Sequence, residues 1–304
     1  MANLREISRR MSSIKSTMQI TRTMEMISTA RIQKALTRAQ EALPYKDAIT
    51  NMLANVAGAS LDESQPLLQG RDEEKHVLFI IVASDRGLAG GFNILQQRQV
   101  EREIEELKAR GIEASVITCG RKPTEYFTYR KIEPVLSFVG ISSDPNMDEA
   151  DRIASYVMDG YANGTIDRVE LLYWHAKNRV DQIQVTEKIL PISREALMMP
   201  NPPRDPEAVS MVDRKAYSDY SFEPSASEVL GYLMPAYIRT VIYHALLDSA
   251  AAEHGARRRA MQSATDNASE VLSTLSHTYN RERQGAITTE LNEIIGGASA
   301  LEDN

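Results

Sequence analysis

Cysteine, aromatic residues and long apolar runs are scarce in this sequence, and each shortage excludes a class of protein. The single cysteine, Cys119, lies in an apolar stretch with no neighbouring histidine or acid, so we interpret it as a small buried residue and not as a nucleophile. One Trp and five Phe among 304 residues favour a chain with only one modest core. The longest apolar run, from Val77 to Ala83, is far shorter than the roughly 20 residues that a membrane span requires.

Signal, metal and enzyme motifs are missing as well. Polar residues interrupt every apolar pair up to Ala30, so no secretory signal is predicted and we expect the chain to stay in the cytoplasm. The five histidines are scattered, and none stands at metal-ligand spacing from another His or from Cys. No hydrolase or metalloprotease motif occurs. We therefore expect no metal, no cofactor and no catalytic centre, so that any chemistry belongs to a partner.

Acidic residues are few near the N-terminus, although the whole chain has a formal net charge of −7. From Met1 to Leu43 the basic side chains outnumber the three glutamates. A run of this kind is usually a solvated helix face. The alternative is a surface for an acidic partner, either nucleic acid or acidic protein loops. A nucleic-acid-binding rod would also need stacking aromatic residues, which this segment lacks.

Proline is absent after Pro235, and good helix formers dominate from Ser225 to Leu301, which we predict to be one helix. A helix of that length runs to roughly 100 Å and cannot be buried in a single globular core. Its apolar residues form a narrow stripe, in which alanine recurs every four residues. An alanine row lets a second helix approach closely. The row consists of Ala252, Ala256, Ala260, Ala264 and Ala268.

The segment from Met1 to Gly58 is predicted to form a second long helix, with an apolar stripe that shifts along its length and with Pro44 as a bend or local break. Neither helix has a core of its own. We therefore predict that they pack together as an antiparallel coiled-coil shaft, formed by residues 1–60 and 208–304.

Residues 71–206 are predicted to form an inserted α/β domain with a mostly parallel sheet, followed by a proline-rich linker from Pro200 to Pro206. A strand, a helix and a second strand make a parallel unit, and two later strands make an antiparallel edge pair. The predicted elements are strand 76–84, helix 93–110, strand 113–119, helix 147–161, and strands 169–176 and 182–189.

One glycine-rich loop, from Ser84 to Asn93, stands between the first strand and the next helix. Backbone N–H groups in such a loop can hold a phosphate. The spacing fits neither G-x-G-x-x-G nor the P-loop pattern, and no lysine follows Gly91. We favour a structural turn, while a small nucleotide-binding α/β protein remains an alternative at this point.

Four separated motifs, in the right order, resemble the gamma subunit of bacterial F-type ATP synthases. They are Arg10-Met11-Ser12-Ser13-Ile14-Lys15-Ser16-Thr17-Met18-Gln19-Ile20-Thr21 continuing through Met24-Glu25-Met26 to Ala30-Arg31; Ser84-Asp85-Arg86-Gly87-Leu88 with Gly90-Gly91 and Asn93; Ala264-Thr265-Asp266-Asn267-Ala268; and Ile287-Thr288, Glu290, Glu293-Ile294, Gly297-Ala298 and Ala300.

The resemblance implies an α/β protein in which the two terminal helices form a long antiparallel coiled coil and the insertion is a Rossmann-like domain. It implies a central rotor shaft that couples proton flow through the membrane ring to ATP synthesis or hydrolysis, on the cytoplasmic face of the bacterial cell membrane. The implied partners are the alpha and beta subunits of the catalytic hexamer, the epsilon subunit and the ring of c subunits. Neither nucleic acid nor direct membrane insertion is expected.

The resemblance also implies which residues touch those partners. Arg22 and Met24 correspond to positions where the shaft meets acidic loops of the beta subunit. Positions on the C-terminal helix correspond to the catch and bearing regions of the hexamer, and they are Arg257, Arg283, Gln284, Thr288, Glu290 and Glu293. Three departures stand beside these matches. Ala89 replaces a cysteine of many relatives, Arg258 and Arg259 add charge next to Arg257, and the linker from Pro200 to Pro206 has no counterpart in the family.

Overall fold

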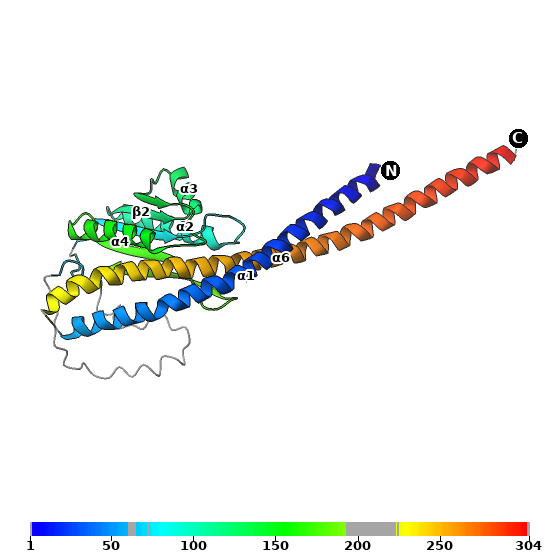
Figure 1. The fold of residues 1–304 in the computed structure, drawn as a ribbon. Coiled ribbons are helices and arrows are strands. Elements are labelled where there is room, and N and C mark those ends of the chain that lie inside the picture. The colour runs from blue at the N-terminus through cyan, green and yellow to red at the C-terminus, as the bar shows by residue number, and fades with distance from the viewer. Residues whose placement is uncertain (1, 60–64, 72, 193–222, 224, 303–304) are drawn as a thin grey trace. The chain divides into compact units, whose positions relative to one another are not determined.

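The computed structural model describes residues 2–59, 65–71, 73–192, 223 and 225–302, so the predicted linker from Pro200 to Pro206 lies outside the described residues. Within them the chain alternates strands and helices between two very long terminal helices (Figure 1). The elements are α1 (Ala2–Ala59), β1 (His76–Val82), α2 (Phe92–Ala109), β2 (Glu113–Cys119), α3 (Arg121–Tyr129), β3 (Leu136–Phe138), α4 (Met147–Ala162), β4 (Arg168–Ala176), β5 (Gln182–Leu190) and α6 (Ala226–Glu302).

Contacts divide the chain into two compact units. The helical unit consists of Met1–Ser28 and Arg258–Asn304, and the sheet unit consists of Thr29–Arg257. Both long helices therefore contribute to both units. This division is based on contacts between residues. The predicted domains, a shaft of residues 1–60 and 208–304 and an α/β domain of residues 71–206, are segments of the sequence, and that domain assignment stays a prediction.

In the helical unit, the start of α1 packs antiparallel to the second half of α6. The hydroxyl groups of Thr21 and Thr265 are 2.8 Å apart. Nearer the N-terminus, Leu4 and Ser8 share the lining of a hollow with Tyr279. Residues nearer the start of α1 therefore lie beside residues nearer the end of α6, as in an antiparallel pair. The same register places Ala2 opposite about residue 284. The long antiparallel helix pair predicted from the sequence is confirmed.

The sheet unit contains five strands in the order β3-β2-β1-β4-β5. All neighbours are parallel except β4 and β5, which form the predicted antiparallel edge pair. The sequence patterns missed α3 and β3, because the nine residues of α3 and the three residues of β3 are too short to show a period.

The central strand β1 is buried on both sides, as its continuous apolar run predicts. On one face, Val77, Phe79 and Ile81 pack with residues of α2 and α3. On the other face, Leu78 and Ile80 pack with α4, with the end of α1 and with the first half of α6. The predicted stripe of α6 is part of this core, since Leu230, Met234, Tyr237 and Val241 are all buried.

Helix α1 runs through Pro44 without a break, so of the two outcomes predicted there the local break is wrong. Proline removes one helical hydrogen bond, and Pro44 is exposed, where water can satisfy the carbonyl that loses its partner. Apolar packing on either side holds the helix, through Ala39 and through Ile49 with Leu53.

Gly120, between β2 and α3, combines a left-handed backbone conformation with a close approach to another backbone segment. Its φ is +116°, and an added Cβ would lie 2.5 Å from the carbonyl oxygen of Ala83. We expect Gly120→Ala to lower the free energy of unfolding by about 3 kcal/mol, from backbone strain and overpacking together. Urea unfolding of the purified chain measures the loss. Gly111→Ala is the control, because φ is +75° there but nothing lies within 4 Å of the added Cβ; equal losses in both variants would contradict the close approach.

The alanine row gives a second stability prediction. Ala260, Ala264 and Ala268 are partly buried in the helical unit. We expect Ala264→Leu to destabilise this unit by about 1–3 kcal/mol, because extra methylenes must enter a close helix contact. Thermal unfolding followed by circular dichroism checks this, with the exposed Gln262→Leu as control. If the two variants melted alike, the row would not be a packing surface.

Candidate functional site

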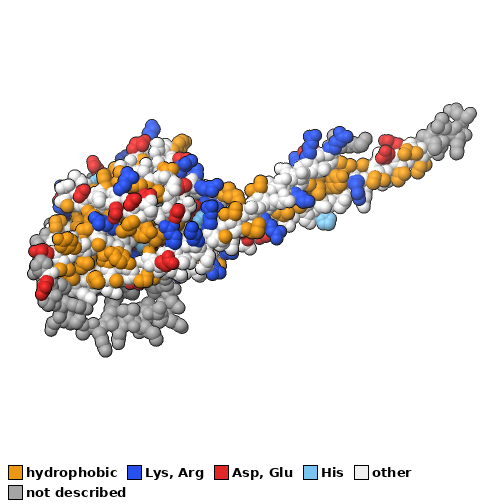
Figure 2. Space-filling view, in the orientation of Figure 1, with side chains coloured by type: hydrophobic (Ala, Val, Ile, Leu, Met, Phe, Trp, Pro, Cys, Tyr) orange, Lys and Arg blue, Asp and Glu red, His pale blue; other side chains and the backbone are white. Residues whose placement is uncertain are grey.

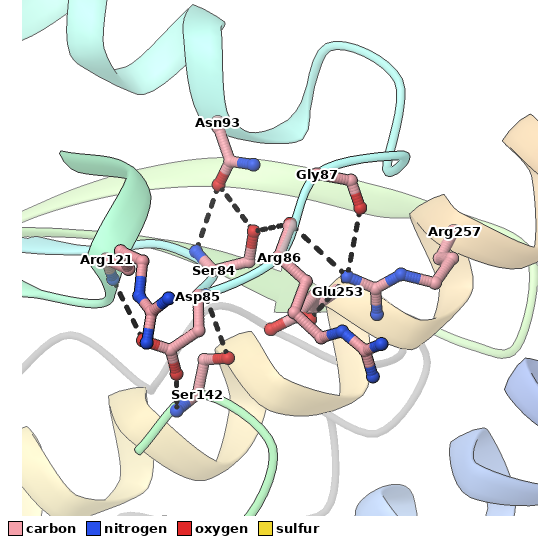
Figure 3. A network of polar contacts seen from close by, with 9 residues as sticks. All are labelled: Ser84, Asp85, Arg86, Gly87, Asn93, Arg121, Ser142, Glu253 and Arg257. Carbon is pink, nitrogen blue, oxygen red and sulfur yellow. Dashed lines mark hydrogen bonds and ion pairs between the residues drawn. The ribbon is translucent and has the colours of Figure 1, made fainter. Parts of the chain in front are cut away.

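The glycine-rich loop is fastened to the sheet by an internal carboxylate. Asp85 follows β1, and its oxygens accept hydrogen bonds from the backbone N–H groups of Arg121 (2.9 Å), Gly140 (2.7 Å) and Ser142 (2.9 Å). These donors lie just after β2 and β3, so one side chain joins the carboxyl ends of three parallel strands. Figure 3 shows the contacts of Asp85 with Arg121 and Ser142. The loop is thereby held in one position.

Asp85 also bears on the nucleotide-binding alternative. Parallel sheets bind phosphates at the carboxyl ends of their strands, through backbone N–H groups and helix N-termini. Here a carboxylate of the chain itself occupies such N–H groups, including that of Arg121, the first residue of α3. Burial alone would raise the pKa of Asp85, but the three backbone N–H groups hold that pKa below its usual value. An anion is thus already bound, which favours the structural turn.

A second fastening joins the loop to α6. Arg257 is 7% exposed, and its Nη2 atom lies 2.7 Å from Oε1 of Glu253, one helical turn earlier. The same nitrogen faces the carbonyl oxygens of Arg86 and Gly87, each at 3.5 Å (Figure 3). Burial raises the pKa of Glu253, although Arg257 opposes that shift. Arg257 and Glu253, both on α6, thus form a buried ion pair whose guanidinium group faces the loop.

A third polar contact joins α6 to β4. Asp248 accepts a hydrogen bond from the backbone N–H of Ala176 at 3.0 Å, and its other oxygen lies 2.5 Å from Nδ1 of His175. Burial would raise the pKa of Asp248, but His175 lowers it below the usual value. Sequence reasoning missed this pair, because no spacing rule relates two residues that meet only when the helix crosses the sheet.

The residues predicted to touch partners do not share one environment. On α1, Arg22 is exposed and Met24 is half-buried. On α6, the five residues Arg283, Gln284, Thr288, Glu290 and Glu293 are exposed. Arg257 is the exception, because it is buried in the sheet unit against Glu253. The structure thus gathers seven of the eight in the helical unit and leaves Arg257 inside the other unit.

Exposed apolar side chains accompany the polar ones at the end of α6. Ile287 is 49% exposed, Leu291 53%, Ile294 63% and Ile295 61%. The register of the helix pair ends near residue 284, so α6 continues beyond its mate for about 17 residues, or roughly 25 Å. An unpaired helix with large exposed apolar residues marks a surface for another protein.

Basic side chains dominate the start of α1. Arg5, Arg9, Arg10, Lys15 and Arg22 are all exposed in the helical unit. One surface ion pair, between Arg10 and Glu6 at 2.9 Å, offsets part of this charge. Figure 2 shows Lys and Arg side chains along the helices. This surface suits an acidic partner.

Neither a metal cluster nor a membrane-crossing helix is found among the residues that the structure describes. No group of three or more His, Cys, Asp or Glu side chains there is arranged to hold a metal ion. No helix in the same part of the chain is both long and apolar enough to cross a membrane.

Comparison with known proteins identifies relatives along the whole length. The family model described as ATP synthase matches residues 3–301. The ATP synthase gamma chain of Heliobacterium modesticaldum is 39% identical over 301 residues, covering 99% of this chain and all of that protein. The ATP synthase gamma chain of Pelotomaculum thermopropionicum is 40% identical over 302 residues, with the same coverage.

Solved structures support the fold. A chain from the Euglena gracilis mitochondrial ATP synthase, in a structure of OSCP, F1 and the c-ring, aligns with a TM-score of 0.66 at 17% identity and covers 99% of this chain and 95% of that one. A chain from the Tetrahymena thermophila mitochondrial ATP synthase central stalk and c-ring aligns with a TM-score of 0.60 at 23% identity, covering 81% and 99%.

The Asp85 contact yields a pH-dependent prediction. We expect Asp85→Asn to lower the free energy of unfolding by about 1.5–3 kcal/mol at pH 7, because an amide loses the charge that three N–H groups solvate. A carboxyl with a depressed pKa stabilises the fold above its unfolded value, about 4, and loses this effect as the pH falls through its folded value. Urea unfolding should therefore show a difference that shrinks below about pH 4.

Glu133→Gln is the matched control for that measurement, since Glu133 is an exposed carboxylate in the same unit. It should leave the stability unchanged throughout. A deficit in Asp85→Asn that persisted undiminished at low pH would contradict the role of the ionised group.

Proposed function

This chain belongs to the ATP synthase gamma chain family, and we propose that it works as the central rotor shaft of an F-type ATP synthase. The observation that carries the proposal is full-length similarity to gamma chains in a chain that combines an antiparallel helix pair with an α/β unit. As a subunit of that complex it performs no bond chemistry in this proposal, and the catalytic work belongs to the alpha and beta subunits.

The shaft acts by binding each conformation of a catalytic subunit differently. A ligand shifts a two-state equilibrium only through its differential affinity for the two states. Moving a subunit from mostly one state to mostly the other takes about 5.5 kcal/mol. Hydrogen bonds to charged groups contribute about 1.5–3 kcal/mol each. A few asymmetrically placed polar side chains therefore suffice, and rotation presents them to each beta subunit in turn.

We assign this contact to the residues that the family resemblance implies. On α1, the exposed Arg22 and the half-buried Met24 face acidic loops of the beta subunit, and the basic surface around Arg22 strengthens that attraction. On α6, the five exposed residues Arg283, Gln284, Thr288, Glu290 and Glu293 contact the catch and bearing regions. Arg257, being buried, reaches these partners only indirectly.

The end of α6 enters an apolar sleeve at the top of the alpha and beta hexamer. The exposed Ile287, Leu291, Ile294 and Ile295 provide the surface that such a sleeve covers. A lone helix of this length is marginal in water, so the sleeve also stabilises the helix.

The remaining partners of the proposal are the epsilon subunit and the ring of c subunits, which bind the α/β unit at the cytoplasmic face of the bacterial membrane. Proton flow through that ring turns the shaft for synthesis, and hydrolysis turns it backwards. The shaft itself is peripheral, bound to the membrane only through the ring.

Purification of the tagged chain from its own cells tests the proposal. Alpha and beta subunits should accompany it in stoichiometric amounts, with ATPase activity in the purified complex. Recovery of nucleic acid instead of these subunits, or of a solitary chain with bound nucleotide, would favour one of the alternatives that the sequence left open.

The sleeve makes a separate prediction about helix dynamics. Amide hydrogens of residues 287–295 should exchange quickly in the isolated chain, because the helix has no mate there, and slowly after assembly with alpha and beta subunits. Mass spectrometry of both samples measures this, and residues 237–246 of the sheet unit, most of which are buried, are the internal control. Slow exchange of residues 287–295 in the isolated chain would contradict the proposal that the hexamer orders this end of α6.

A further inference from the structure

Helix α6 leaves the sheet unit at Arg257, since the helical unit begins with Arg258. A small cluster surrounds the last turns before this point, which we call the collar. The collar joins α1, the glycine-rich loop, β4 and α6. Its members are Ala35, Leu36, Ala89, Phe92, Trp174, Ala176, Ala251, Ala252 and Ala256.

The collar contains mostly small side chains, so its shape depends on where the loop lies. Ala89 is 3% exposed, and Phe92 stacks on Trp174 with ring centroids 5.6 Å apart. Nε1 of Trp174 donates a hydrogen bond to the carbonyl oxygen of Phe92 at 2.9 Å. The loop and the start of α2 therefore form one wall of the collar, while α6 forms another.

Two charged side chains contact the glycine-rich loop. Asp85 fastens the start of the loop to the sheet. Arg257 faces the next two carbonyl groups, those of Arg86 and Gly87. Between the fastenings and α2, Leu88 has a positive φ of 65° and is 62% exposed. A bulky residue in that backbone region persists only where its surroundings fix it.

We propose that Arg257, oriented by Glu253, is a positioning residue that fixes the glycine-rich loop against α6 and thereby stiffens the collar through which torque passes between shaft and sheet. The inference rests on the rotor function proposed above. It assigns Arg257 a task within the chain and not a direct contact with the hexamer.

The chemistry of the pair suits this task. A guanidinium group presents several donors in one plane, so it can pair with Glu253 and face two carbonyl oxygens together, which a lysine ammonium on a flexible stem does less well. The contacts to the carbonyl oxygens are long, 3.5 Å. They act as attraction between a buried charge and two dipoles, which is strong where water is excluded.

His254 does not compete with Arg257 for Glu253. Burial, reinforced by Arg257 and Arg31, lowers the pKa of His254 to about 4. His254 is therefore uncharged at neutral pH, and Arg257 is the cation paired with the buried Glu253.

The chain carries its own reporter of the collar, because Trp174 is its single tryptophan. In the purified full-length chain, Arg257→Ala should shift the emission of Trp174 to longer wavelength and raise its quenching by acrylamide about twofold, as the loop moves away. Arg259→Gln is the matched control, an exposed arginine two residues further along α6, and should leave both signals unchanged.

Restoring the Trp174 signals chemically would show that Arg257 positions the loop and that the variant has not simply lost stability. Guanidinium ion at about 10 mM should restore the Trp174 signals of Arg257→Ala by filling the vacated site, whereas equal sodium or ammonium chloride should not. Arg257→Lys, which keeps the charge, should remain folded with an intermediate signal. The proposal is overturned if Arg257→Ala shows the same Trp174 signals as wild type. It is also overturned if guanidinium does not reverse the shift in Arg257→Ala while Arg257→Lys has wild-type signals.

The assembled enzyme supplies the functional test. Arg257→Lys should lower the number of protons pumped per ATP hydrolysed by about twofold or more relative to wild type, because a less rigid collar transmits less torque. An unchanged ratio would refute the inference while leaving the rotor function intact. Failure of the wild-type chain to support pumping would instead refute the rotor function.

Discussion

Helix α6 must satisfy three different environments in succession, and the rest of the structure depends on how it does so. Its first half packs into the core of the sheet unit through large residues such as Leu230 and Ile238. Its middle changes to alanine, where the collar and then α1 come close. Its end has exposed isoleucine and leucine. Residue size along one helix thus changes with what each part of that helix packs against.

Polar groups then fix positions that apolar packing leaves adjustable. Apolar contacts are not directional, so they define the position of a helix on a sheet less sharply than hydrogen bonds do. Asp248 prevents this on α6 by accepting a hydrogen bond from a backbone N–H of β4. Asp85 does the same for the loops at the end of the sheet. Each such residue is buried or half-buried and has its partners, as buried charges require.

The sequence predicts the long-period features of this fold well and its polar contacts poorly. Continuous apolar runs predicted β1 and β2 almost to the residue, and the four-residue alanine spacing predicted a close helix pair. Helix α3 and strand β3 were not predicted, because tertiary packing and not a sequence period defines such short elements. The pairing of His175 with Asp248 escaped for a related reason, since 73 residues separate them and only the completed fold brings them together. Motif resemblance named Arg257 but could not show that its side chain points inward.

The position of the one cysteine has a practical consequence for experiments on rotation. Cys119 is fully buried in the sheet core, and burial raises the pKa of its thiol, so the reactive thiolate is suppressed at neutral pH. Maleimides and bifunctional thiol reagents will therefore not react with Cys119 in the folded native chain. A cysteine introduced anywhere on the surface becomes the sole target, and a probe or a bead can be attached there without first removing a native residue.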